Sequence, residues 1–146
     1  MTRLGFVGLG RMGAAMAPRL LGEGRALTVW NRNAARATPL VAAGATLAAT
    51  PAEVARGAEI VFSMIRDDAA AAEVYEGPQG FLAAPLEGRL FVEMSTLRPA
   101  TIARLAQQYV AILAAAAQSL PDLGIMANSA RLLRQPKSAR QRKGRK

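Results

Sequence analysis

The sequence contains no cysteine and no histidine, and aromatic residues make up only 5% of its 146 residues. The absence of cysteine excludes disulfides, thiolate nucleophiles and cysteine-ligated metal sites. The absence of histidine removes the side chain that most often acts as a general base or as a metal ligand. We therefore expect no metal centre, and no residue of the chain stands out as catalytic.

Lysine is absent from the first 130 residues, whereas eight of the 19 basic residues lie in the last sixteen positions. Those positions hold no acidic residue, so most of the net charge of +9 belongs to them. We predict a folded domain over residues 1–118 and an irregular, basic, disordered tail over residues 119–146. The tail can bind nucleic acid phosphates, but it has no aromatic residue for base stacking, so nucleic acid is the less favoured partner.

Long apolar runs are also missing. The longest uncharged stretch, residues 105–121, contains three glutamines. Its apolar part, residues 109–117, is far shorter than the roughly 20 residues that span a bilayer. The apolar run near the amino terminus is short, glycine-rich and followed by Arg11, unlike a signal peptide. We expect a cytoplasmic protein with no membrane partner.

Segments that favour strands alternate with segments that favour helices along the first 118 residues. The expected strands span residues 4–7, 26–30, 46–48, 59–65 and 90–94. The expected helices span residues 11–23, residues 33 to about 43, and segments that begin near Pro51, Asp67 and Pro99; Met12, Met16 and Leu20 share one face of the first, and Ile102, Ala106, Tyr109 and Leu113 share one face of the last. This alternation predicts an α/β fold with a Rossmann-type, doubly wound parallel sheet.

A glycine-rich loop follows the first expected strand and opens the first expected helix. It reads Gly8-Leu9-Gly10-Arg11-Met12-Gly13. In that context the G-x-G-x-x-G pattern is typical of a dinucleotide-binding turn. Gly8 permits the tight turn, Gly10 leaves room for a pyrophosphate, and Gly13 lets helix and strand pack closely. The alternative is a strand-to-helix turn that binds no ligand.

The residues after the second expected strand favour NADP over NAD. Dehydrogenases that use NAD carry an acidic residue about 20 residues past the loop, where it binds the ribose. This chain has Asn31, Arg32 and Asn33 there. An acid would repel a 2′-phosphate, whereas the Arg32 guanidinium would attract it and the Asn31 amide can hydrogen-bond it. A solvated surface arginine is the alternative.

Several segments resemble a known family in the same order along the chain. They are Gly5–Ala17, Trp30–Arg32, Met64–Ile65, Val74–Gly80 and Glu93–Thr96. Over about residues 3–108 the chain resembles the cofactor-binding domain of the β-hydroxyacid dehydrogenases, which include the 3-hydroxyisobutyrate dehydrogenases and the glyoxylate/succinic semialdehyde reductases. Arg66 stands where the family has a proline.

The resemblance implies the positions of the cofactor contacts. Residues 8–13 would hold the pyrophosphate and residues 31–33 the adenosine phosphate. Met64 and Ile65 would lie beside the nicotinamide-side ribose, and Thr96 would approach the nicotinamide. For Met64 and Ile65, core packing is the alternative; for Thr96 and the adjacent serine, the alternative is capping of the helix that begins at Pro99. The implied activity is hydride transfer between NADP and a small hydroxyacid or semialdehyde.

The resemblance ends near residue 108. The family continues into a sixth strand, a substrate motif and a helical domain that bears the catalytic lysine, and none of these is recognisable here. We expect a fold truncated before the substrate domain, through a frameshift or truncation near residue 109, and a chain that is inactive alone. Two other readings stay open: a basic-tailed nucleic-acid-binding protein, and a cofactor-binding partner subunit. An apolar face left uncovered would favour self-association.

Overall fold

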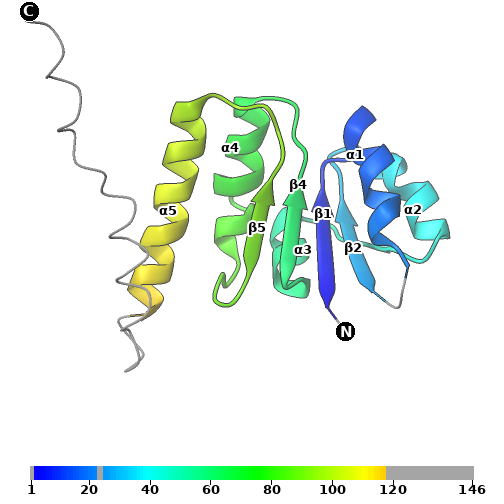
Figure 1. The fold of residues 1–146 in the computed structure, drawn as a ribbon, viewed down its shortest axis with the longest axis horizontal. Helices are drawn as coiled ribbons and strands as arrows, with labels where there is room; N and C mark the ends of the chain where they lie inside the picture. Colours follow the sequence, from blue (N-terminus) through cyan, green and yellow to red (C-terminus); the bar gives the residue numbers. More distant parts are fainter. Residues whose placement is uncertain (1, 23–24, 118–146) are drawn as a thin grey trace, which may run out of the picture.

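The structure is a computed structural model that describes residues 2–22 and 25–117. Its strands form one parallel sheet in the order β3-β2-β1-β4-β5 (Figure 1). The strands are β1 (Arg3–Val7), β2 (Ala26–Trp30), β3 (Thr46–Leu47), β4 (Ile60–Ser63) and β5 (Leu90–Glu93). The chain runs outward from β1 to β3 and then crosses back to β4, so the strand order reverses between β1 and β4. Ligands bind at such reversals in open α/β sheets, outside the carboxyl ends of the strands.

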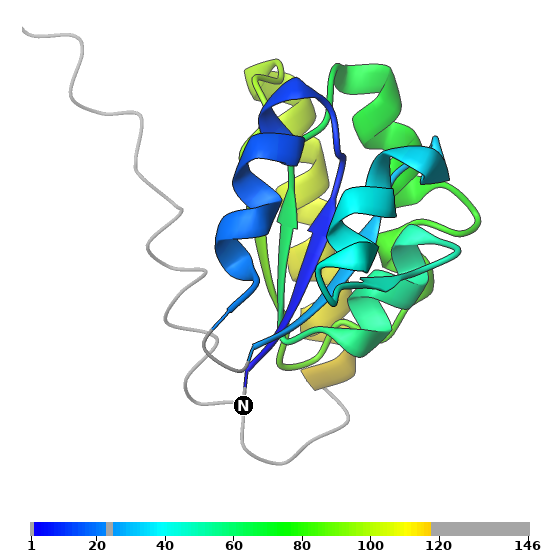
Figure 2. The ribbon, with the colours of Figure 1, turned by 90° about the vertical axis from the view of Figure 1, so that its right-hand side faces the viewer.

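Helices cover both faces of this sheet. They are α1 (Arg11–Met16), η1 (Ala17–Leu20), η2 (Ala34–Ala37), α2 (Thr38–Ala42), α3 (Pro51–Gly57), α4 (Asp68–Glu76), η3 (Phe81–Ala83) and α5 (Pro99–Ala117). In Figure 2, α1 lies on one side of the strands and α3 and α4 lie on the other. The predicted Rossmann-type α/β sheet is therefore confirmed, with all five expected strands. The predicted tail, residues 119–146, lies outside the described residues.

Each face of the sheet has its own apolar core, because successive side chains of a strand point to opposite faces. Leu4 and Phe6 of β1 belong to the core under α1 and α2, together with Leu40. Val7 belongs to the core under α3, α4 and α5, together with Leu105. The central strand β1 is thus buried on both faces, and the glycine loop follows directly after its last residue, Val7.

Three polar residues begin helices where the sequence predicts it. The Oδ1 atom of Asn33 accepts a hydrogen bond from the N–H of Ala35 at 3.1 Å. Thr50 Oγ1 accepts from the N–H of Glu53 at 3.1 Å, and Asp67 Oδ1 accepts from the N–H of Ala70 at 2.8 Å. Each bond satisfies one of the N–H groups that lack a partner in the first turn of a helix.

Two details of the helices differ from expectation. The single helix expected over residues 11–23 is replaced by α1 and the short turn η1, which contains Pro18; a proline has no N–H to continue an α-helix. In α5 the side chain that packs into the core is Leu105, which is 6% exposed, whereas Ile102 is 39% exposed. Tyr109, on the same expected face as Ile102, packs against Phe91 of β5 with ring centroids 5.4 Å apart. The expected face is therefore packed only in part, because α5 covers the edge of the sheet; Leu113 lies outside the described side chains.

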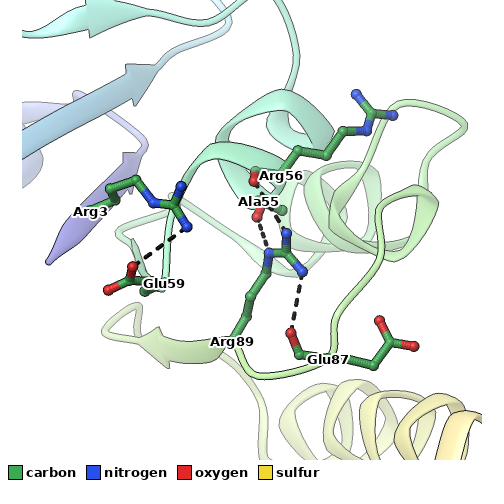
Figure 3. A network of polar contacts seen from close by, with 6 residues as sticks. All are labelled: Arg3, Ala55, Arg56, Glu59, Glu87 and Arg89. Atoms are coloured by element: carbon green, nitrogen blue, oxygen red, sulfur yellow. Dashed lines mark hydrogen bonds and ion pairs between the residues drawn. The ribbon is translucent and has the colours of Figure 1, made fainter.

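At the end of the sheet where the strands begin, an arginine side chain hydrogen-bonds to the end of α3 (Figure 3). The guanidinium of Arg89, just before β5, donates to the carbonyl oxygens of Ala55 and Arg56 in the last turn of α3 and to that of Glu87. The last carbonyl groups of a helix have no partner within the helix, so this side chain satisfies two of them. Arg3 and Glu59 form an exposed ion pair of 3.5 Å at the same edge.

Candidate dinucleotide site

A cleft of about 610 Å³ opens at the carboxyl ends of β1, β2 and β4. Ten of the residues that the sequence predicts as cofactor contacts line it: Gly8, Gly10, Arg11, Met12, Gly13, Asn31, Arg32, Asn33, Met64 and Ile65. The other two do not. Leu9 is fully buried in the core under α1, and Thr96 is exposed beyond the end of β5. The structure thus brings the predicted residues of three strand ends into one cleft.

The three glycines of the loop have different surroundings. Gly8 has a φ of +96°, and a Cβ there would lie 2.2 Å from the carbonyl oxygen of Met64. A Cβ on Gly13 would lie 1.9 Å from the carbonyl oxygen of Gly8. A Cβ on Gly10 would meet no atom within 4 Å. Gly8 and Gly13 are therefore required by the protein's own backbone, whereas Gly10 leaves open space in which a ligand can approach the main chain.

Asn31 organises the loop from the end of β2. Its Oδ1 accepts a hydrogen bond of 2.8 Å from the N–H of Leu9, and its Nδ2 donates to the carbonyl oxygen of Asn33 at 2.9 Å. The acceptor of this amide and one of its donors are therefore already engaged within the protein. Because Asn33 caps the turn η2, Arg32 is the member of this segment whose polar group remains available.

The cleft carries a positive charge that the sequence reveals only in part. Arg11 and Arg32 are exposed, and within the described part of the chain neither makes a hydrogen bond or an ion pair. Arg36 also lines the cleft, and its Nη1 lies 3.4 Å from the carbonyl oxygen of Leu9. The predicted set lacks Arg36, although its place four residues after Arg32, in the turn η2 that Asn33 caps, was a usable signal.

The opposite wall adds Arg66, which sequence reasoning noted only as a departure from the family. Its Nε lies 2.7 Å from Oδ2 of Asp67. The N–H of Ala70, and then the guanidinium of Arg66, hold the pKa of Asp67 below its usual value, and Arg32 contributes more weakly. Among the described residues that line the cleft, Glu73 is the only acidic one. The site as a whole favours an anionic ligand.

A smaller hollow of about 350 Å³ adjoins the cleft on its β3 side. It is lined by Trp30, Asn31, Arg32, Ala34, Leu47, Ala48 and Ala49. The indole N–H of Trp30 donates to the carbonyl oxygen of Ala49 at 3.0 Å, which fixes the ring. Arg32 belongs to both the hollow and the cleft, so its guanidinium stands where the two meet.

Tyr75 reaches the carboxyl ends of two strands from helix α4. Its hydroxyl donates to Oε2 of Glu93 at 3.0 Å and lies 3.0 Å from Oγ of Ser63, and these two residues end β5 and β4. The long side chain of tyrosine allows this contact between helix and sheet. Burial, and then the negative charge of Glu93, raise the pKa of Tyr75. Tyr109, by contrast, donates to the carbonyl oxygen of Arg89 at the other end of β5.

The alternative of helix capping does not apply to Ser95. Its Oγ accepts a hydrogen bond of 2.5 Å from the N–H of Ile65. Just before α5, Asp68 Oδ1 of α4 accepts from the N–H of Arg98 at 3.0 Å and so connects the start of α5 to α4.

The part of the chain that the structure describes holds no group of three or more metal-ligating side chains. Nor does a described helix have the length and apolarity to cross a bilayer.

Comparisons with known proteins agree with this geometry. Residues 3–118 match the family model of the NAD binding domain of 6-phosphogluconate dehydrogenase. The chain is 44% identical over 105 residues to the cytokine-like nuclear factor N-PAC of Danio rerio, and this alignment covers 72% of the chain and 23% of that protein. The chain is 34% identical over 105 residues to the chloroplastic glyoxylate/succinic semialdehyde reductase 2 of Arabidopsis thaliana, and this alignment covers 72% of the chain and 29% of the reductase.

Among solved structures, a reductive aminase from Aspergillus terreus in complex with NADPH and ethyl levulinate superimposes with a TM-score of 0.64. It is 37% identical, and the match covers 76% of this chain and 38% of the aminase. The chain therefore spans less than a third of the curated relatives described above and about two fifths of this structure. The predicted cytoplasmic location stays a prediction, since one relative is named a nuclear factor.

The glycine loop, the order of the strands and these relatives identify an NAD(P)-binding domain that belongs to the family of 6-phosphogluconate dehydrogenase and the β-hydroxyacid dehydrogenases.

Proposed function

We propose that this domain binds NADP in preference to NAD. The observation that carries the proposal is Arg32, an exposed guanidinium that makes no hydrogen bond or ion pair with the described residues, at the end of β2, where a carboxylate would bind the ribose of NAD. Arg36 supplies a second guanidinium to the same part of the cleft. A 2′-phosphate would form charge-assisted hydrogen bonds with such groups, and these are about twice as strong as neutral ones.

The topology supports one orientation of the cofactor. The hollow beside Arg32 would take the adenosine, and the open space over Gly10 would take the pyrophosphate, flanked by Arg11 and Met12. Since β4 and β5 lie on the other side of β1, the nicotinamide half would extend over their carboxyl ends. It would then lie against Met64 and Ile65, with Thr96 beyond them. Gly8, Leu9 and Gly13 would shape the loop rather than touch the ligand, as would Asn31 and Asn33.

We further propose that the domain serves an oxidoreductase that acts on a small hydroxyacid or semialdehyde, and that the chain on its own is inactive. When bound, the nicotinamide supplies or accepts the hydride, and the reaction also needs a proton donor beside the carbonyl oxygen. Residues 1–130 contain no lysine, histidine or cysteine. Tyr75 is 8% exposed and its hydroxyl is hydrogen-bonded within the protein, so it does not meet the cleft.

A second candidate is a cofactor-binding partner subunit that performs no chemistry. The N-PAC relatives favour it, because proteins that align with this domain at 38–44% identity are named as nuclear factors rather than as enzymes. The apolar side chains of Leu90 on β5 and Ile102 on α5 are both exposed, and each could be covered by a partner. Both candidates require the same cofactor site, so binding is the property to measure first.

The fluorescence of Trp30, the only tryptophan, tests the proposal directly because this side chain lines the cleft. We expect saturable quenching by NADPH, with a dissociation constant at least about tenfold lower than that for NADH. Arg32→Gln should weaken NADPH binding by about 10- to 100-fold and change NADH binding by less than about threefold. Arg19→Gln, an exposed arginine of η1 outside the cleft, is the matched control.

Equal binding of the two dinucleotides would refute the preference for NADP while leaving a cofactor site. The absence of binding by either one would refute the cofactor site itself. Turnover by the chain alone with NADPH and a small semialdehyde would refute the proposed inactivity and, with it, the second candidate.

A further inference from the structure

The peptide bond between Met64 and Ile65 lies between the glycine loop and Ser95, just past the end of β4. Its carbonyl oxygen faces the glycine loop so closely that a Cβ on Gly8 would come within 2.2 Å of it. Its N–H donates a 2.5 Å hydrogen bond to Oγ of Ser95. In a trans peptide the C=O and N–H point in opposite directions, so the hydrogen bond to Ser95 orients the peptide plane, and the missing side chain of Gly8 leaves room for the carbonyl oxygen on the other side.

Ser95 is itself held by a carboxylate. Its backbone N–H donates to Oε1 of Glu93 at 2.7 Å. Oε2 of the same carboxylate accepts from Oγ of Ser63 at 2.7 Å and from the hydroxyl of Tyr75 at 3.0 Å. Ser63 is 1% exposed. The carboxylate therefore joins the ends of β4 and β5 to α4, and the segment that bears Ser95 has little freedom to move.

This network ends at the wall of the cleft. Met64 and Ile65 line the cleft, whereas Ser63, Glu93 and Ser95 do not. Because the N–H of Ile65 is already donated to Ser95, this wall offers a ligand the apolar side chains and the carbonyl groups. A shift of the peptide plane would move both side chains, so the position of the wall depends on a serine that a bound ligand would not touch.

We propose that Ser95 is a positioning residue for the nicotinamide half of the cofactor: its hydroxyl fixes the Met64–Ile65 peptide and thereby the surface on which that half lies. This inference rests on the proposed function for the orientation of the ligand. It assigns Ser95 no contact with the cofactor. The adenosine half, which would lie at the end of β2, is outside its influence.

The test compares Ser95→Ala, which removes the acceptor, with Ser95→Thr, which keeps a hydroxyl. Hydrogen exchange of the Ile65 amide, measured by NMR on the ligand-free protein, reports the bond directly. We expect exchange at least about tenfold faster in the alanine variant and close to the wild-type rate in the threonine variant. Dissociation constants are then measured for NADPH and for adenosine 2′,5′-bisphosphate, which lacks the nicotinamide half.

Ser95→Ala should weaken NADPH binding by about tenfold, leave the bisphosphate within about twofold of wild type, and be rescued by Ser95→Thr. The positioning role would be overturned if Ser95→Ala weakened the binding of NADPH and of the bisphosphate equally, or if it left NADPH binding unchanged. Unaltered hydrogen exchange of the Ile65 amide would overturn it as well. If wild type binds neither dinucleotide, the proposed function fails and the role toward the cofactor fails with it. The exchange rates would still show whether Ser95 holds the peptide.

Discussion

The two ends of the sheet use arginine in opposite ways. At the amino-terminal edge, Arg89 donates to three carbonyl oxygens, two of them at the end of α3 (Figure 3). At the carboxyl-terminal edge, Arg11 and Arg32 make no hydrogen bond or ion pair within the described part of the chain. The same side chain completes the fold at one end and is left available at the other.

This difference distinguishes an arginine that stabilises the fold from one that is available to bind a ligand. A guanidinium carries five N–H donors in a planar fork, and burying them unpaired is costly. Arg89 is half-buried and satisfied by main-chain acceptors, whereas Arg32 stays exposed at the edge of an open cleft. Arg32, which makes no hydrogen bond or ion pair with the described residues, lines the same cleft as the open space over Gly10, and together they mark the end of the sheet that we expect to meet a ligand.

The largest effect that tests this comparison concerns the glycine loop. Gly13→Ala should lower the free energy of unfolding by about 3 kcal/mol or more, since its Cβ would lie 1.9 Å from the carbonyl oxygen of Gly8. Gly10→Ala should change it by less than about 1 kcal/mol, yet weaken NADPH binding by at least about tenfold. Urea denaturation and the Trp30 titration measure the two quantities. A Gly10→Ala variant that binds NADPH normally would show that the ligand does not approach this part of the main chain.

The second test removes the hydrogen bonds that Arg89 makes at the amino-terminal end of the sheet. Arg89→Ala should lower the free energy of unfolding by about 2 kcal/mol, because it leaves carbonyl groups of α3 without their donor. Arg89→Lys should recover only part of the loss, since an ammonium group cannot span three acceptors in a plane. NADPH binding should stay within about twofold of wild type in both variants. A large change of affinity with unchanged stability would reverse the roles assigned to the two edges.

The smallest effect concerns the buried hydroxyl at the end of β5. Tyr75→Phe should lower the free energy of unfolding at neutral pH by about 1 kcal/mol, because Glu93 loses one hydrogen-bond donor. Burial raises the pKa of Tyr75 in the folded state, whereas the unfolded chain releases this proton at about pH 10. The stability of wild type should therefore fall as the pH rises above about 10, and the phenylalanine variant should lack that part of the fall.

Circular dichroism against pH and urea checks this prediction, with both proteins measured in parallel. The NADPH affinity of Tyr75→Phe should stay close to that of wild type, because Ser63 still donates to the carboxylate and Ser95 still holds Ile65. A loss of NADPH affinity as large as that of Ser95→Ala would mean that the carboxylate, rather than Ser95, governs the wall of the cleft.

Local chemistry made much of this molecule predictable. Asn33, Thr50 and Asp67 begin helices because their side chains satisfy N–H groups only two or three residues away. The glycine loop follows from a short strand and the spacing of its glycines. Contacts with neighbours distant in sequence were not predictable in this way: Leu105 of α5 is more deeply buried than Ile102, and Tyr75 reaches two strand ends from its helix.

The sequence by itself determined the fold class and the segments that form the cofactor cleft, because turn geometry, helix caps and the alternation of strands and helices are encoded within short stretches. Only the tertiary structure decided which of those residues support the fold and which remain available to a ligand. In the folded chain the Asn31 amide accepts a hydrogen bond from Leu9, Arg36 and Arg66 line the cleft, and Ile65 donates to Ser95 between the ends of β4 and β5. Hydrogen bonds between residues about 30 positions apart depend on the register of parallel strands, and that register forms only when the sheet and both helix layers assemble.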